Sequence, residues 1–217
     1  MKKEQRFQLV LGYFQGHQPM AETELRYSDP YQLTVAVILS AQCTDKRVNM
    51  ITPAFFKMFP DVWSLAVAEP ESVVKLIASC TYPNNKTKSL IGMAKALTVR
   101  YNGKLPSDVD ELQKIPGIGR KTANVLASVI FNKPVLAVDT HVFRVSARIG
   151  LTTGARTPLQ TEQQLLLHIP ENLRSIAHHW LILHGRYTCV ARKPKCGECG
   201  ISAFCKYFLT KQATIVC

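Results

Sequence analysis

The sequence predicts an all-α fold, and three observations support this fold class. Apolar residues recur at helical spacing, and cap residues or glycines stand where such stretches should begin or end. The opening segment has apolar residues at i, i+3, i+4 and i+7: Phe7, Val10, Leu11 and Phe14. No segment alternates apolar and polar residues with a period of two, and nothing pairs with the one short run, 135–138, that could be extended.

The expected helices follow one another along the chain. Asp29 as a cap and Pro30 at the first helical position begin the second helix. Its stretch 33–39 is apolar on every side, which predicts a central, buried helix. Cap residues indicate further helix starts at Thr52-Pro53, Asp61, Glu69-Pro70, Thr87 and Ser107. Gly103 and Gly150 lie where helices should end.

Composition and charge narrow the choice of partner. The 217 residues suffice for one large domain or two small ones, and 27 Lys and Arg against 15 Asp and Glu give a formal net charge of +12. Such an excess favours a polyanion, because each neutralised phosphate releases counterions; a basic surface without a partner is the alternative. The sequence has no export signal, membrane-spanning run or basic amphipathic helix with an aromatic face, so we expect a soluble, cytoplasmic protein.

Four of the seven cysteines form a cluster near the C-terminus. They have the spacing C-x6-C-x2-C-x5-C and are Cys189, Cys196, Cys199 and Cys205. The cytosol keeps thiols reduced, so the cluster indicates a metal site, either zinc or a [4Fe–4S] cluster. Zinc modules favour two C-x2-C pairs, and this chain has one. Cys217 stands alone, and we interpret Cys43 and Cys80, also isolated, as small buried hydrophobic residues.

The segment 112–123 reads as a helix, a tight turn and a second helix. Pro116 ends the first helix, and Gly117 and Gly119 allow backbone angles that other residues avoid. The second helix should begin near Arg120, with its first amide groups pointing into the turn. Such a helix start can bind a phosphate oxygen. The alternative interpretation of this segment is a connection between two helices that binds no ligand.

Lys121 and Asp139 are the candidate reactive pair. Lys121 lies in the first turn of the second helix, where the helix dipole opposes an ammonium by only about 0.3–1 kcal/mol. Freeing an amine for attack therefore also needs desolvation or a proton acceptor. Asp139 can supply the acceptor, and it follows the apolar run 135–138 at the expected N-cap of the next helix. A cap with no further role is the alternative for Asp139.

Several motifs resemble those of the endonuclease III family of iron–sulfur DNA glycosylases with abasic-site lyase activity. They are Gly-Ile-Gly-Arg-Lys-Thr-Ala at 117–123, Val-Asp-Thr-His-Val-Phe-Arg at 138–144 and the cysteine spacing. The resemblance covers nearly the whole chain and favours a [4Fe–4S] cluster over zinc. It implies the helix-hairpin-helix glycosylase fold, in which two helical lobes flank a DNA-binding cleft.

The resemblance also implies where the two lobes lie in the sequence. One is expected over 23–133 and contains the helix-hairpin-helix at about 107–131. The other joins 1–22 to 134–217 and carries the C-terminal [4Fe–4S] cluster loop. Lys121 and Asp139 are expected to face each other across the cleft.

The family's activity would make this chain a bifunctional enzyme of base excision repair. By resemblance, Lys121 attacks C1′ of the damaged nucleotide, Asp139 activates it, and the Schiff base permits β-elimination of the 3′ phosphate. Oxidised pyrimidines and abasic sites in double-stranded DNA are the implied substrates. We expect a monomer that associates with the nucleoid through DNA.

The resemblance implies a set of DNA contacts. The stretch 39–45 resembles Leu-Ser-x-Gln-x-Thr-Asp, in which the glutamine, Gln42 here, fills the space of the extruded base and Asp45 caps the next helix. Gln42 as a polar helix end is the alternative. Tyr82 is the candidate to stack on the opposite strand. The remaining expected contacts are Ile115, Gly117, Gly119, Arg120, His141, Arg144, Arg192, Lys193 and Lys195.

Two rival functions remain open from the sequence. A monofunctional adenine glycosylase shares the hairpin and the cluster, but it uses a glutamate on the helix matching 33–39 and usually lacks the lysine. Residues 31–44 contain no acid, and Lys121 is present. A non-catalytic iron–sulfur protein that binds DNA or transfers electrons would not need Lys121 and Asp139.

Overall fold

The computed structural model describes residues 1–215, with side chains described to residue 212, so Cys217 lies outside the described residues. All regular elements in residues 1–215 are helical, and the run 135–138 is irregular backbone. The all-α prediction is therefore confirmed. The chain forms two compact units, one spanning Glu24–Phe131 and the other joining Met1–Thr23 to the chain from Asn132 onward.

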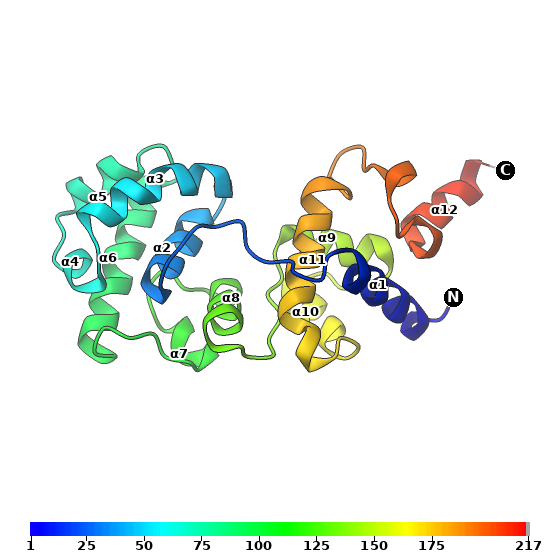
Figure 1. The fold of residues 1–217 in the computed structure, drawn as a ribbon, viewed down its shortest axis with the longest axis horizontal. Helices are drawn as coiled ribbons and strands as arrows, with labels where there is room; N and C mark the ends of the chain where they lie inside the picture. Colours follow the sequence, from blue (N-terminus) through cyan, green and yellow to red (C-terminus); the bar gives the residue numbers. More distant parts are fainter. Residues whose placement is uncertain (216–217) are drawn as a thin grey trace. The chain divides into compact units, whose positions relative to one another are not determined.

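The unit Glu24–Phe131 is built around α2, which packs against α3, α6 and α8 (Figure 1). Its helices are α2 (Pro30–Ser40), α3 (Asp45–Met58), α4 (Val62–Ala66), α5 (Pro70–Ile77), α6 (Pro83–Arg100), α7 (Val109–Gln113) and α8 (Arg120–Phe131). Asp29 caps α2, since its Oδ1 accepts from the Gln32 amide at 2.8 Å. Every residue from Leu33 to Leu39 is buried, as expected for a central helix.

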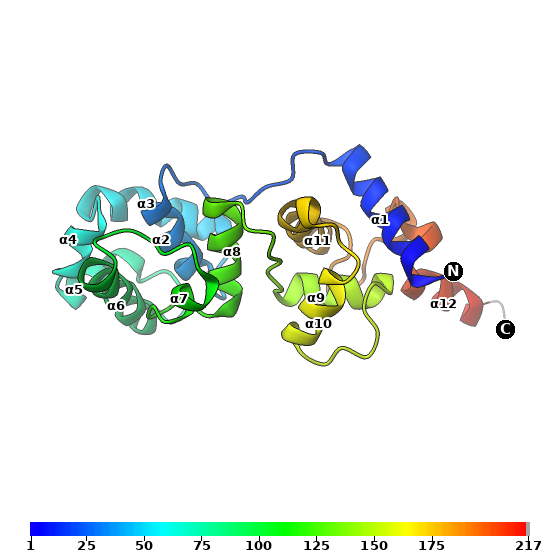
Figure 2. The same ribbon diagram turned by 90° about the horizontal axis from the view of Figure 1, so that it is seen from below.

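The other unit brings the N-terminal helix beside the C-terminal segment, as Figures 1 and 2 show. Its elements are α1 (Lys3–His17), α9 (Thr140–Ile149), α10 (Pro158–Leu166), α11 (Arg174–Tyr187) and α12 (Lys206–Ile215), with short 3-10 turns at Glu171–Leu173, Cys196–Glu198 and Ser202–Phe204. Arg6 Nε donates to the Phe204 carbonyl at 3.0 Å and ties α1 to the last of these turns.

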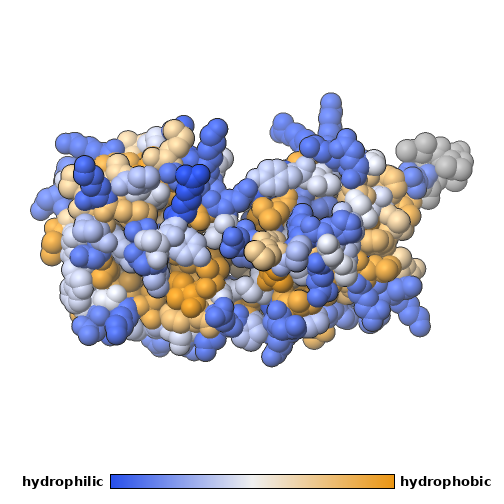
Figure 3. Space-filling model, in the orientation of Figure 1, coloured by the Kyte–Doolittle hydropathy of each residue, from blue (hydrophilic) through white to orange (hydrophobic). Residues whose placement is uncertain are grey.

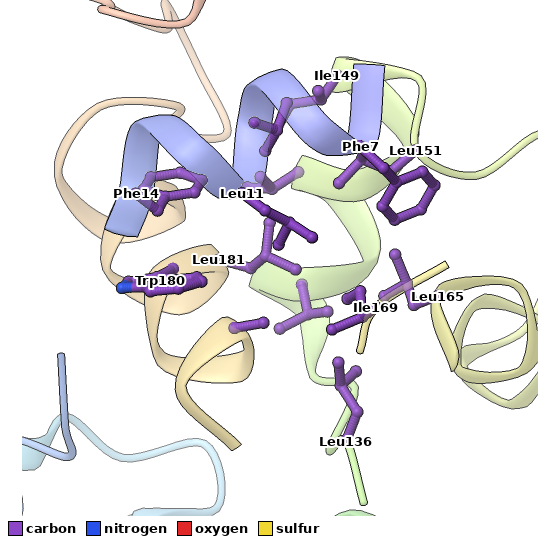
Figure 4. Close-up of a cluster of buried hydrophobic side chains, with 14 of the residues drawn as sticks. Phe7, Leu11, Phe14, Leu136, Ile149, Leu151, Leu165, Ile169, Trp180 and Leu181 are labelled. Atoms are coloured by element: carbon purple, nitrogen blue, oxygen red, sulfur yellow. The ribbon is translucent and has the colours of Figure 1, made fainter. Parts of the chain in front are cut away.

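A continuous hydrophobic core holds this second unit together (Figure 4). It gathers apolar side chains from α1, α9, α10 and α11 and from the C-terminal segment. Phe14 of α1 stacks on Trp180 of α11 with ring centroids 5.8 Å apart, and Trp180 Nε1 donates to the Gln18 carbonyl at 2.7 Å. The core thus fixes the helices that precede and follow the cysteine-rich segment.

Three predicted helix starts, at Thr52-Pro53, Thr87 and Ser107, are wrong. Pro53 lies inside α3, which begins at Asp45 and continues through the proline. The burial of Val48, Thr52 and Phe55 on one face offsets the roughly 3 kcal/mol that an interior proline costs. α6 begins at Pro83 rather than Thr87, because proline suits the first helical position.

Cap positions account for the remaining differences at helix ends. α7 begins at Val109, and its cap is Asp108 rather than Ser107, because Asp108 Oδ1 accepts from the amides of residues 110 and 111. Thr44, not Asp45, caps α3, with Oγ1 accepting from the Arg47 amide at 3.2 Å. The expected starts at Asp61 and Glu69-Pro70 are confirmed, and so are the helix ends near Gly103 and Gly150.

Hydrophilic side chains cover much of the face drawn in Figure 3, with apolar side chains exposed between them. Within residues 1–215, none of the helices combines the length and apolar character needed to cross a bilayer.

Candidate active site

The helix-turn-helix predicted at 112–123 is formed by α7, a tight turn and α8. Ile115 donates from its amide to the Leu112 carbonyl at 3.1 Å, and the Ile118 amide donates to the Ile115 carbonyl at 3.1 Å. The side chains of Ile115 and Ile118 are both buried, which anchors the turn in the unit. The Ile115 side chain is therefore not available to a ligand, and the amide and carbonyl groups of this residue already shape the turn.

The two glycines of the turn have different roles. Gly117 has φ +81°, and a Cβ there would lie 2.6 Å from Ser89 Cβ, so glycine is required. Gly119 lacks a positive φ, which corrects the expectation that both glycines need unusual backbone angles. A Cβ at Gly119 would meet no atom within 4 Å, and the turn therefore has open space in front of the start of α8.

Lys121 lies in the first turn of α8 and is exposed, as is the preceding Arg120. The Gly119 carbonyl accepts from the Ala123 amide at 2.9 Å, which fixes the helix start directly after the turn. The buried side of α8 from Ala123 to Ser128 holds the helix against the core. A rigid helix thus presents an exposed amine beside a turn suited to phosphate.

Two loops of the same unit come together at Gln42 and Tyr82. Gln42 lies between α2 and α3, and Tyr82 lies between α5 and α6. Both side chains are exposed, and both residues have the left-handed φ of +53° that is uncommon for residues other than glycine. Thr81 Oγ1 donates to the Gln42 carbonyl at 2.7 Å, and this hydrogen bond joins the loops.

Lys86 connects two segments of this unit, a role that nothing in the sequence indicated. Its side chain is 6% exposed, and its Nζ donates to the Leu39 carbonyl at 2.8 Å and to Thr81 Oγ1 at 3.3 Å. It therefore links the end of α2 to the loop that carries Tyr82. A lysine in a polar stretch gives no signal of burial, and these partners lie 47 and 5 residues away.

Asp139 is the N-cap of α9, in the unit that contains the four clustered cysteines. Its Oδ1 accepts from the Val142 amide at 2.8 Å, and its carbonyl accepts from the Phe143 amide at 2.9 Å. The side chain is half-buried, and the run 136–138 just before it is buried. The cap and the buried run together hold the carboxylate in one orientation.

Arg144 is engaged inside the protein. Its Nη2 donates to the Gly185 carbonyl at 2.9 Å and to the Cys189 carbonyl at 3.2 Å, and it lies 3.2 Å from His141 Nδ1. The guanidinium thus fastens α9 to the end of α11 and to the first cysteine. This is a positioning role, and His141 is half-buried beside it.

The four clustered cysteines line one pocket with about 330 Å³ of empty space, part of it open to solvent. Apolar side chains such as Ile149, Ile201 and Phe208 complete the lining. All four are free thiols, and burial raises the pKa of Cys199 and Cys205. A metal centre would deprotonate these thiols, so its binding releases protons.

The donor set fits an iron–sulfur cluster. Four thiolates in an apolar pocket are the ligands that such clusters use. Within the described residues, no three His, Cys, Asp or Glu side chains are grouped closely enough to hold a single metal ion. A four-iron cluster is larger than one ion, and its ligands stand correspondingly farther apart, so the two findings are compatible.

Arg148, which the sequence analysis did not single out, anchors the loop between the first two cysteines. Its Nη1 donates to the Val190 carbonyl and its Nη2 to the Ala191 carbonyl, both at 2.8 Å. The guanidinium also lies 5.2 Å from the centre of the Tyr207 ring. The next residues in the loop include three exposed cations, Arg192, Lys193 and Lys195.

Comparisons with known proteins identify the family. Residues 35–171 match the HhH-GPD superfamily of base excision DNA repair proteins, and residues 189–205 match the iron–sulfur binding domain of endonuclease III. Endonuclease III of Rickettsia felis is 45% identical over 92% of this chain and 93% of its own length. This chain belongs to the endonuclease III family. Its four clustered cysteines accordingly lie in an iron–sulfur binding domain.

Further members of the endonuclease III family give the same result. The Escherichia coli K12 enzyme is 40% identical over 95% of this chain and 97% of its own length. A solved structure of a trapped endonuclease III–DNA covalent intermediate superposes with a TM-score of 0.92 at 38% identity, over 98% of this chain and all of that one. A non-covalent endonuclease III–DNA complex gives 0.93 at 37% identity, with the same coverage.

Proposed function

We propose that this chain is a bifunctional DNA glycosylase and abasic-site lyase that removes oxidised pyrimidines from double-stranded DNA. The observation that carries the proposal is its similarity, over 98% of its length, to an endonuclease III trapped as a covalent intermediate with DNA. A covalent intermediate requires a nucleophile. The exposed Lys121 on the rigid first turn of α8 is our candidate.

The proposed reaction uses one amine and one carboxylate. Asp139 accepts a proton from Lys121, and the free Nζ forms a bond to C1′ as the C1′–N bond to the damaged base breaks. Ring opening of the sugar gives a Schiff base between Lys121 and C1′. This cation acidifies the C2′ hydrogen, whose removal expels the 3′ phosphate by β-elimination. Hydrolysis of the Schiff base then frees the lysine.

The turn between α7 and α8 is the proposed phosphate grip. The open space in front of Gly119 lets a phosphate oxygen approach the start of α8 closely. Gly117 shapes the turn, the Ile115 backbone lies beside it, and the exposed Arg120 adds a positive charge. Such contacts fix the position of the strand without reading its sequence.

Gln42 and Tyr82 are the proposed wedges. A base buried in a duplex must be extruded before its glycosidic bond can be attacked, and the gap needs filling. The two exposed side chains stand on adjoining loops that Thr81 and Lys86 tie together. Strained backbone at positions of this kind is characteristic of functional sites.

The iron–sulfur cluster has a structural part in the proposal. Cys189, Cys196, Cys199 and Cys205 are its proposed ligands, and when bound it supplies covalent cross-links that hold the loop in shape. The loop cations Arg192, Lys193 and Lys195, with His141, contribute proposed contacts to the DNA backbone. No step of the reaction passes through the cluster. Binding to DNA would associate the protein, as a monomer, with the nucleoid.

A panel of duplexes that each carry one lesion tests this function. We expect excision of thymine glycol and similar pyrimidines, and strand cleavage that leaves the unsaturated aldehyde produced by β-elimination. Excision of adenine opposite a damaged base, without strand cleavage, would instead indicate a monofunctional adenine glycosylase. Tight binding to every duplex without any excision or cleavage would indicate a non-catalytic binding protein.

A further inference from the structure

Cys43 and Cys80 form a thiol pair outside the cysteine cluster. Their sulfur atoms lie 3.6 Å apart, although the residues are separated by 37 positions in the sequence. Both are free thiols; Cys80 is buried with 4% exposure, and Cys43 is only half-buried, unlike the buried residue expected. A disulfide has a length of about 2.05 Å, so the sulfurs need to approach by only about 1.5 Å.

Both cysteines lie outside the helices of this unit. Cys43 is in the segment between α2 and α3, and Cys80 is in the segment between α5 and α6. Neither residue belongs to a helix, although the Cys43 amide donates to the Ser40 carbonyl at 3.1 Å and the Cys80 amide to the Ile77 carbonyl at 2.9 Å. The short distance between the two sulfur atoms is therefore the observation that favours a bond between them.

The surroundings of Cys80 hold it as a neutral thiol until a disulfide partner is within reach. Burial raises the pKa of Cys80 to about 11, while the positive charges of Lys86 and Arg47 act in the opposite direction. Lys86 is held in place by its hydrogen bond to the Leu39 carbonyl. Nearby cations stabilise a thiolate as it forms. Cys43 is the more accessible sulfur and would meet an oxidant first.

The pair is coupled to the proposed wedges. Cys43 directly follows Gln42, and Cys80 stands two residues before Tyr82. Both Gln42 and Tyr82 have left-handed backbone, and Thr81 Oγ1 already donates to the Gln42 carbonyl. Drawing the two sulfurs together therefore displaces residues in both loops.

We propose that Cys43 and Cys80 form a reversible disulfide by exchange with a low-molecular-weight disulfide such as oxidised glutathione, and that this bond slows base extrusion. The effect on extrusion rests on the proposed function, whereas the bond itself does not. A displacement of about 1 Å at a positioning group is enough to lower a rate by as much as about 100-fold.

The exchange balances in two steps. The Cys43 thiolate attacks one sulfur of oxidised glutathione, which forms a mixed disulfide and releases one glutathione thiolate. Cys80 then loses its proton and attacks the Cys43 sulfur, which releases the second glutathione. The protein loses two electrons and two protons, and one oxidised glutathione becomes two reduced molecules.

Peptide mapping of the intact, cluster-loaded protein tests the bond. After treatment with oxidised glutathione, alkylation and trypsin digestion, we expect peptide 27–46 joined to peptide 76–86, because each contains a single cysteine. Dithiothreitol should separate them, and Cys43→Ser and Cys80→Ala should give no joined peptide. Recovery of both wild-type peptides as alkylated or merely glutathionylated species would overturn the proposal.

Single-turnover excision on a thymine glycol duplex tests the effect of the bond. We expect the joined protein to react at least fivefold more slowly, with recovery in dithiothreitol and no response in Cys43→Ser. The visible absorbance of the cluster, unchanged throughout, excludes damage to it as the cause. An unchanged rate in fully joined protein would overturn the regulatory effect. If reduced wild-type protein excises no lesion, the proposed function fails, while peptide mapping still decides whether the bond forms.

Discussion

Asp139 occupies the N-cap of α9, where Oδ1 accepts from the Val142 amide at 2.8 Å, and we assign the same carboxylate a proton-accepting role. Asparagine keeps the capping oxygen but cannot take the proton. Asp139→Asn should therefore retain its unfolding free energy within about 0.5 kcal/mol and lose at least about 100-fold in lyase rate. Asp139→Ala should lose activity and also about 1 kcal/mol of stability.

Urea unfolding and single-turnover cleavage of an abasic duplex measure the two effects of these Asp139 substitutions separately. Full lyase activity in the asparagine variant would limit Asp139 to capping. Equal losses of stability in both variants would show that the carboxylate charge, rather than the capping oxygen, holds the start of α9.

Substitutions of Gly117 and Gly119 should separate an effect on stability from an effect on DNA binding. Gly117→Ala forces a side chain into left-handed backbone at φ +81° and against Ser89, which should cost about 2–3 kcal/mol of stability. Gly119→Ala meets nothing within 4 Å, so it should fold normally and bind abasic duplex at least fivefold more weakly, because its methyl group fills the space proposed for phosphate. Thermal melting and fluorescence anisotropy report these changes. Normal DNA affinity in Gly119→Ala would contradict the phosphate grip.

The roles of residues that depend on neighbours in the sequence could be predicted from the sequence. The capping by Asp29 and the left-handed backbone at Gly117 follow from the residues beside them in the sequence, and both predictions are confirmed. The contact between Cys43 and Cys80 and the burial of Lys86 depend on segments far apart in the chain. No local pattern encodes such pairings, which is why the sequence missed them.

The sequence analysis predicted no start for α10, α11 and α12. For the helices that it did predict, the existence of the element was easier to predict than its start. α3 continues through Pro53 because tertiary burial of its apolar face outweighs the local cost of the proline. α6 begins four residues before the predicted Thr87, because Pro83 serves as its first residue after a left-handed Tyr82. Packing against the rest of the unit thus carried α3 through its proline, whereas a local preference of proline set the start of α6.

α11 carries a buried histidine whose titration should limit stability in acid. Burial, with the charge of Arg186 adding to it, lowers the pKa of His179 to about 4, below its ordinary value of 6.5. The unfolded chain therefore takes up the proton first, and the unfolding free energy should fall as the pH drops from about 6.5 to 4. The slope from one histidine is at most about 1.4 kcal/mol per pH unit.

Urea unfolding at pH 7, 6 and 5 measures this dependence, with His179→Gln as the comparison. The variant should lose less stability on acidification than the wild type, by about 1 kcal/mol per pH unit. His184, whose pKa burial also lowers to about 4, still titrates in both proteins, so some slope remains. If the unfolding free energies of the wild type and His179→Gln depended equally on pH, the lowered pKa of His179 would be contradicted.

Across the full chain, the sequence predicted the all-α class, the family and the iron–sulfur domain, all of which are confirmed. Helical periodicity and cysteine spacing are properties of the sequence itself, so they could be read directly. The anchoring of the cluster loop by Arg144 and Arg148 could not, because their acceptors lie about 40 residues farther along the chain. Side-chain contacts of this range appear only once the helices are packed.

The net charge of +12 leads to a prediction about how the affinity for DNA depends on salt concentration. If Lys195 contacts a backbone phosphate, Lys195→Ala should reduce the slope of log affinity against log salt by about 0.9 and weaken binding equally for all duplex sequences. Lys57→Ala removes the charge of another exposed lysine that we assign to no DNA contact, and it should leave the slope unchanged. Equal slopes in the wild type and Lys195→Ala would remove this residue from the interface.

Trapping with sodium borohydride on an abasic duplex is the most direct test of the amine chemistry. Borohydride reduces a Schiff base to a stable bond, so wild-type protein should become linked to DNA, and peptide sequencing should locate the link at Lys121. Lys121→Gln should fold, retain its cluster and bind the duplex, yet form no adduct. An adduct of undiminished yield in Lys121→Gln, or a link located at another lysine, would contradict the account.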